Sequence, residues 1–93
     1  MKTALFTKDP HAIMDYSVDW SDWLNSTDTI NSSTWITASG ITASSSSVDS
    51  SNKITTVRLQ GGTANGQYRV TNRITTTAGL QTDRSIYIMV EER

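Results

Sequence analysis

Histidine and serine are the residues of this sequence that could support nucleophilic catalysis. A Ser-His-Asp arrangement needs an imidazole that its neighbours hold in place. The sequence has one histidine, His11, which follows Pro10 in a segment without strand or helix periodicity. Its many serines are typical of a chain rich in strands and loops. We therefore expect no catalytic residue and no enzymatic activity.

Four aspartates are the strongest candidates for a metal site: Asp15, Asp19, Asp22 and Asp28. Calcium takes six to eight oxygen ligands from converging loops, and the spacing of these residues matches no calcium-loop motif. Turn and capping roles explain Asp19, Asp22 and Asp28 equally well. We expect no metal site, no cofactor and no rise in thermal stability when calcium is added.

The glycines of the segment 61–66 could belong to a phosphate-binding loop. Phosphate loops depend on the amino terminus of a helix, and no helix is predicted after this segment. A turn between two strands explains Gly61, Gly62 and Gly66 better.

The elements that must position these residues are strands. The chain has 93 residues, the size of one domain, and 28 of them are Ser or Thr. Period-two alternation of apolar and polar residues predicts strands over 14–20, 29–37, 41–45, 54–60, 68–75 and 85–90. A bulge near Ser32-Ser33 would bring Ile30 and Trp35 to one face. The prediction is an all-β, immunoglobulin-like, two-sheet antiparallel sandwich.

Alternation also predicts which side chains form the core. The segment Gly66-Gln67-Tyr68-Arg69-Val70 resembles the tyrosine corner of immunoglobulin-like folds. The predicted core is Tyr16, Val18, Trp20, Ile30, Trp35, Val57, Leu59, Tyr68, Val70, Ile74, Ile86, Ile88 and Val90. No cysteine is present to add a disulfide.

Residues 1–13 show no alternation and contain the breaker Asp9-Pro10, so we predict an extended N-terminal arm before a sandwich domain of residues 14–93. Its apolar anchors would be Leu5, Phe6, Ile13 and Met14. Ordering such an arm costs about 1–2 kcal/mol per residue. We therefore expect it to be mobile in the free chain and to pack on a neighbouring subunit or another protein of an assembly. Deleting residues 2–12 should then leave the melting of the domain nearly unchanged; the alternative is that the arm folds back over its own sandwich and caps an open edge.

Three further side chains are candidates for an interface. Trp23 lies in a turn, out of phase with Trp20, where an exposed ring would suit a sugar platform or a subunit contact. Arg69 and Arg73 alternate outward from a strand and favour inter-subunit ion pairs. The candidate interface residues are therefore Leu5, Phe6, Trp23, Arg69 and Arg73.

Charge is unevenly distributed along the chain. The net charge is −1, which gives no electrostatic case for nucleic acid as a partner. Residues 9–49 contain six Asp and no Lys or Arg, whereas cations outnumber carboxylates from Lys53 onward. Two solvated faces of opposite sign explain this, and so does a head-to-tail contact between copies. We expect no membrane partner, because nothing approaches the apolar length of a membrane span, and no cleaved signal peptide.

Two blocks of sequence resemble a known family. The first runs from Asp15 to Leu24 (DYSVDWSDWL) and continues with Asp28 to Trp35 (DTINSSTW). The second comprises Gln60 to Ala64 (QGGTA) and Tyr68 to Ile74 (YRVTNRI). Together they resemble small virion structural proteins of tailed bacteriophages, and in particular the fiber–tail adaptor proteins of short-tailed phages.

The resemblance implies a mechanical function without catalytic residues. It implies a subunit that assembles in several copies as a ring between tail and fibers. Its partners would be copies of itself and other phage tail, connector or fiber proteins, and its location the virion, after assembly in the host cytoplasm. The alternatives are a carbohydrate-binding or spacer module and a capsid or neck decoration protein.

Overall fold

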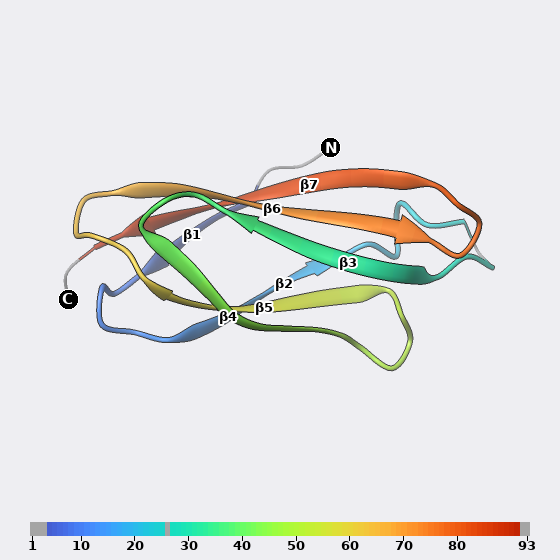
Figure 1. The fold of residues 1–93 in the computed structure, drawn as a ribbon, viewed down its shortest axis with the longest axis horizontal. Coiled ribbons are helices and arrows are strands. Elements are labelled where there is room, and N and C mark those ends of the chain that lie inside the picture. The colour runs from blue at the N-terminus through green and yellow to red at the C-terminus, as the bar shows by residue number, and fades with distance from the viewer. Residues whose placement is uncertain (1–3, 26, 92–93) are drawn as a thin grey trace.

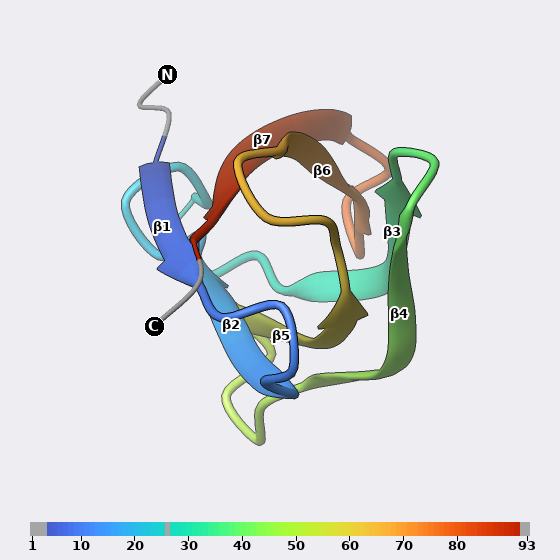
Figure 2. The same ribbon diagram turned by 90° about the vertical axis from the view of Figure 1, so that its left-hand side faces the viewer.

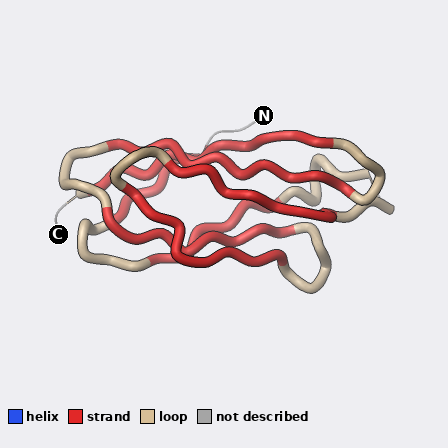
Figure 3. Tube along the Cα trace, viewed as in Figure 1, coloured by secondary structure: helices blue, strands red, loops and turns tan. Residues whose placement is uncertain are grey.

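The computed structural model describes residues 4–25 and 27–91, which form seven strands in two packed layers (Figures 1 and 2). The strands are β1 (Ala4–Lys8), β2 (Met14–Asp19), β3 (Ile30–Thr37), β4 (Ile41–Val48), β5 (Ile54–Gly61), β6 (Gln67–Thr76) and β7 (Gln81–Val90). Turns and loops connect them at both ends of an elongated molecule, and no described residue is helical (Figure 3).

The strands divide into a four-stranded and a three-stranded sheet. Sheet A has the order β1-β7-β6-β3, and sheet B has the order β2-β5-β4. Every pairing is antiparallel except that of β1 with β7, which is parallel. The predicted two-sheet sandwich is therefore confirmed, with one parallel strand added at an edge.

The core lies between the inner faces of the two sheets. Of the thirteen predicted core residues, eleven are buried, while Trp35 and Tyr68 are half-buried and pack against the others. Leu24 and Ile41 are buried as well. The alternation missed Leu24 because it lies in the loop after β2, where no period applies.

Two strands contain irregularities in pairing. The register of β3 against β6 shifts between Ile30 and Ser32, next to the predicted bulge, and both Ile30 and Trp35 contact the core. A second shift in β4 lies between Ala43 and Ser45. This strand continues to Val48, beyond its predicted end, because backbone pairing with β5 extends the strand through serines that bury little apolar surface.

The expectation that residues 1–13 contain no strand is wrong. Residues Ala4–Lys8 form β1 and pair with Ile86–Val90 of β7 in the same chain. The Phe6 ring lies 5.1 Å from that of Tyr16, and Lys8 is 2% exposed. Pairing with the edge of β7 and contacts with distant core residues order this segment. Its own sequence pattern reveals neither of them. The division between an arm and a domain at residue 14 stays a prediction.

The predicted tyrosine corner is present at the start of β6. The hydroxyl of Tyr68 accepts a hydrogen bond from the backbone N–H of Thr63 at 2.8 Å. Gly66 is required here because a Cβ on it would lie 2.8 Å from that hydroxyl oxygen. The corner holds the β5–β6 turn against the sandwich.

Candidate interaction surface

The outer face of sheet A carries a row of large side chains across three strands. The register places Leu5 of β1 beside Tyr87 of β7, and Tyr87 beside Arg69 of β6. Leu5 is 64% exposed, Arg69 is exposed and Tyr87 is half-buried. Met89, also half-buried, stands two residues along β7 on the same face. Interfaces between proteins are enriched in Tyr, Met and Arg.

This row joins two of the predicted interface residues, Leu5 and Arg69. Phe6 is one position away from Leu5 in a strand, so its side chain points to the opposite face. There it is half-buried against Tyr16 and contributes to the core. Phe6 therefore supports the position of β1, while Leu5 is the exposed member of the pair.

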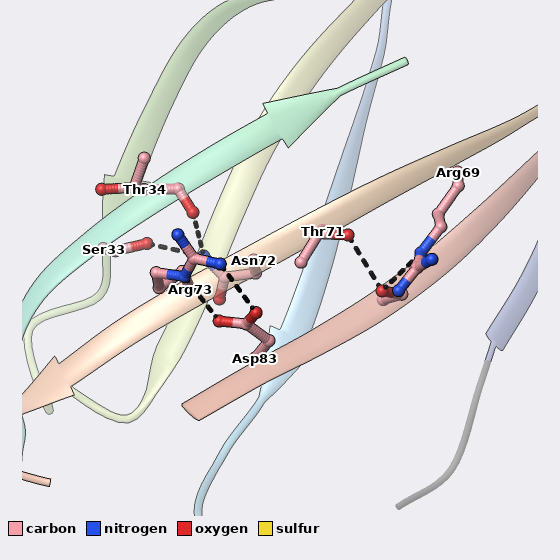
Figure 4. A network of polar contacts seen from close by, with 8 residues as sticks. Ser33, Thr34, Arg69, Thr71, Asn72, Arg73 and Asp83 are labelled. Carbon is pink, nitrogen blue, oxygen red and sulfur yellow. Dashed lines mark hydrogen bonds and ion pairs between the residues drawn. The ribbon is translucent and has the colours of Figure 1, made fainter. Parts of the chain in front are cut away.

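The two arginines of β6 have polar partners within the chain (Figure 4). The Arg69 Nε donates to the Ser85 hydroxyl at 3.2 Å. Arg73 makes a two-pronged contact with Asp83 of β7, at 2.8 and 3.0 Å. Hydrogen bonds from Arg73 hold the pKa of Asp83 below its usual value. An inter-subunit role for Arg73 stays a prediction, and the chain itself already supplies its carboxylate.

Trp23 is half-buried in the loop after β2. Its ring meets that of buried Trp20 edge-on, with centroids 5.8 Å apart. The Arg84 guanidinium lies 4.5 Å from the Trp20 ring and donates to the Asp19 carbonyl at 2.9 Å. Arg84 thereby ties this loop to β7. The Trp23 ring packs partly against the core, and its role as a sugar platform or subunit contact stays a prediction.

The aspartates that were considered as metal ligands have separate partners. Arg58 pairs with Asp15 at 2.8 Å, and its hydrogen bond lowers the pKa of that carboxyl. Asp19 accepts the backbone N–H of Ser21, while Asp28 accepts those of Thr29 and Ala78. Among residues 4–25 and 27–91, no three His, Asp or Glu side chains are grouped to hold an ion. Metal independence stays a prediction, to be checked by melting with and without calcium.

His11 lies exposed in the loop between β1 and β2. Its backbone N–H donates to Asp9 at 2.8 Å, which shapes the turn after β1. Gly61 is the last residue of β5, and Gly62 and Gly66 lie between β5 and β6, as the turn hypothesis expected. The part of the chain that is described has no helix long and apolar enough to cross a membrane.

A buried polar cluster connects the two sheets, and sequence reasoning did not single it out. Asn72 of β6 accepts hydrogen bonds from the Trp20 indole at 3.0 Å and from the Thr55 hydroxyl at 2.6 Å. Its amide nitrogen donates to the Ser33 hydroxyl and the Thr34 carbonyl of β3. The β6 alternation already placed Asn72 inward. A polar amide at an inward position was the available sequence signal, because buried polar groups need hydrogen-bond partners.

The comparison with protein-family models decides the family of this chain. Residues 8–89 match the family described as Podophage GP4 fiber-tail adaptor protein gp77. The chain belongs to this family. As a member of the fiber–tail adaptor family, it has a structural role in a phage virion, as the resemblance implied.

A solved structure supports the fold independently. The solution structure of the PKD domain from KIAA 1837 protein is similar to this adaptor family member, with a TM-score of 0.51 and 21% sequence identity. The similarity covers 97% of this chain and 80% of that one. At this identity the likeness concerns the fold alone. No curated protein matches the sequence.

Proposed function

We propose that the chain is a non-catalytic adaptor subunit that assembles in several copies as a ring and links the phage tail to its fibers. The family match over residues 8–89 carries this proposal. It includes assembly in the host cytoplasm, with copies of the chain and other tail, connector or fiber proteins as partners. Nucleic acid and membrane are not among the proposed partners.

The outer face of sheet A suits contact with another tail protein. The row of Leu5, Tyr87 and Arg69, with Met89 beside it, combines apolar area with one exposed cation. Aromatic and Arg side chains of this kind dominate binding energies when a partner excludes water from them. We propose this face as the site that binds the tail or fiber protein.

Removing the gene from the phage and examining the virions tests this function. We expect virions without the chain to retain tails and to lack fibers, and a plasmid copy of the gene to restore them. Image reconstruction of complete virions should place several copies where tail and fibers meet. Fibers attached normally in the absence of the chain would contradict the proposal, and so would a location on the capsid or neck.

Two matched arginines test the proposed face. Arg69 is exposed on the outer face of sheet A, and Arg58 is exposed on that of sheet B. We expect Arg69→Gln to reduce fiber attachment several-fold and Arg58→Gln to leave it unchanged, with melting temperatures compared for both. Equal effects of the two substitutions would argue against a partner site on sheet A.

A further inference from the structure

The four open strand edges of the sandwich are not equally protected. β1 and β3 are the edges of sheet A, and β2 and β4 are those of sheet B. An open edge presents unpaired backbone N–H and C=O groups that can pair with another chain. Proteins protect such edges with charged side chains, proline or bulges.

Both edges of sheet B carry one of these devices. β2 has exposed carboxylates at Asp15 and Asp19. β4 has the register shift between Ala43 and Ser45, which interrupts its regular geometry near its middle. A strand that approached either edge would meet exposed charged side chains or a kink.

Neither edge of sheet A carries such a device along its regular part. The irregularity of β3 ends at Ser32, and residues 32–37 are regular and contain no charge or proline. β1 has a continuous register, and its only charged residue, Lys8, is turned inward. The Lys8 Nζ donates to the carbonyls of Asp9 and Gly61 at 2.9 and 2.8 Å. Burial lowers the pKa of this amine, and the charge does not protect the edge.

The same two edges carry exposed apolar side chains. Leu5 of β1 is 64% exposed and Ile36 of β3 is 43% exposed. Ile36 stands opposite Thr71 of β6, on the outer face that also carries Leu5 and Tyr87. Sheet A thus has one such residue at each of its opposite edges. Figure 2 shows the two edge strands, β1 at the left and β3 at the right of the molecule.

We propose that β3 of one copy pairs with β1 of the next, so that sheet A continues from copy to copy. β3 and β7 both run antiparallel to β6, and β1 is parallel to β7, so β1 and β3 point the same way. Copies in the same orientation therefore form a parallel pair, with Ile36 and Leu5 on one face. A head-to-tail contact of this kind gives a ring when its rotation closes.

This inference rests on the proposed multi-copy assembly and names the surface that makes it. A pairing of five or six residues is small compared with a stable interface. Affinity between two free copies should therefore be weak, and ring closure should strengthen it because each added contact becomes intramolecular. A method that traps transient pairs is the appropriate test.

Disulfide trapping can be applied directly because the chain contains no cysteine. The double variant Leu5→Cys/Ile36→Cys places thiols at edges separated by three strand spacings, about 14 Å. A disulfide needs Cα atoms within about 7 Å, so any bond must join two copies. In the concentrated full chain we expect oxidation to give a ladder of covalent multimers. A mixture of the two single variants should give the mixed dimer.

The matched control is Ser17→Cys/Ser47→Cys, which places thiols on the two edges of sheet B. These residues flank Thr56 of β5 in one row, and we expect no multimers from them. Homodimers from Ile36→Cys alone or Leu5→Cys alone would overturn the proposal in favour of a two-fold contact. Monomers throughout, in the concentrated chain and in virions, would also overturn it.

Lysine substitutions give a second readout without oxidation. Leu5→Lys and Ile36→Lys should each weaken self-association of the full chain at least tenfold in sedimentation. Leu80→Lys is the control, since Leu80 is 48% exposed but lies in the β6–β7 turn. A mixture of the two edge variants should form dimers and no larger species. An equal effect of Leu80→Lys would overturn the proposal, whereas absence of the chain from virions would overturn only the adaptor function.

Discussion

Sheet A and sheet B share one core but differ on their outer faces. The outer face of sheet A combines Leu5, Tyr87, Met89 and Ile36 with two arginines of β6. The outer face of sheet B is polar apart from half-buried Ile54 of β5: it carries Thr42, Ser45 and Ser47 of β4, Asp15, Ser17 and Asp19 of β2, and Thr56, Arg58 and Gln60 of β5. Even its shallow hollow of about 110 Å³ is lined by Asp, Ser, Thr and Arg.

This difference agrees with the proposal that sheet A binds a partner while both sheets share the work of folding. The inner faces supply the apolar contacts that stabilise both sheets, so the outer faces can differ without changing the fold. Sheet B exposes hydroxyls and internally paired charge to solvent. Sheet A exposes apolar area and unprotected edges, which are features of a surface that other proteins cover.

The largest expected effect comes from Trp20, which serves both sheets. The Trp20 side chain is fully buried and donates to Asn72 of sheet A and Thr55 of sheet B. Trp20→Ala should lower the free energy of unfolding by about 3–5 kcal/mol, as for other large core truncations. The same substitution at half-buried Trp35 of sheet A should lower the free energy of unfolding by roughly half that amount, because folding buries less of the apolar area of this side chain. Chemical denaturation measures both, and a larger loss at Trp35 would reverse the ranking.

Removing β1 tests whether the open edge of sheet A belongs to the fold. Deleting residues 2–12 removes the pairing with β7, the Phe6 contact with Tyr16 and the two hydrogen bonds of Lys8. Because one half-buried aromatic ring and a short ladder of backbone hydrogen bonds are removed, we expect the free energy of unfolding to fall by about 2–4 kcal/mol. This revises the expectation that the truncated domain melts unchanged. An unaltered denaturation midpoint would show that β1 adds nothing to the isolated sandwich.

Asn72 tests the polar link between the sheets. Asn72→Ala leaves the Trp20 indole with only its longer bond to Thr55 and the Ser33 hydroxyl without its amide donor. Buried polar groups that lose their partners cost about 1–3 kcal/mol, and we expect the free energy of unfolding to fall by this amount. The control is Asn31→Ala, which removes an exposed amide at the β3 bulge and should change stability little. Similar denaturation curves for the two variants would mean that the cluster is not a significant link.

The smallest expected effect concerns acid stability at the β4–β5 loop of sheet B. Hydrogen bonds from Ser51 and from the backbone N–H groups of Ile54 and Lys53 lower the pKa of Asp49 from 3.8 to about 2. A depressed carboxyl pKa contributes stability above the unfolded value, and this contribution is lost as pH falls through the folded value. The wild-type chain should therefore lose stability between pH 3.8 and about 2 more steeply than Asp49→Asn. Parallel curves in acid would show that these hydrogen bonds do not distinguish the ionised form.

The strand pattern of this protein was readable from its sequence. Alternation in β2, β5, β6 and β7 places Val18, Val57, Val70 and Ile88 inward whatever the neighbouring strands are, because successive side chains in a strand point to opposite faces. The tyrosine corner was predictable because Gly66 and Tyr68 are close in sequence. The family resemblance came from two local blocks in the same way, and the family match over residues 8–89 confirms it.

Tertiary structure alone decided which distant segments meet. Nothing within residues 4–8 indicates a strand, because β1 forms against the edge that β7 supplies. The row of Leu5, Tyr87 and Arg69 exists because the order β1-β7-β6 places three separate segments side by side. The same order turns Lys8 inward and leaves the edges of sheet A without charge. Side-chain direction is a local property of a strand, whereas strand order and edge exposure depend on pairings between residues far apart in the sequence.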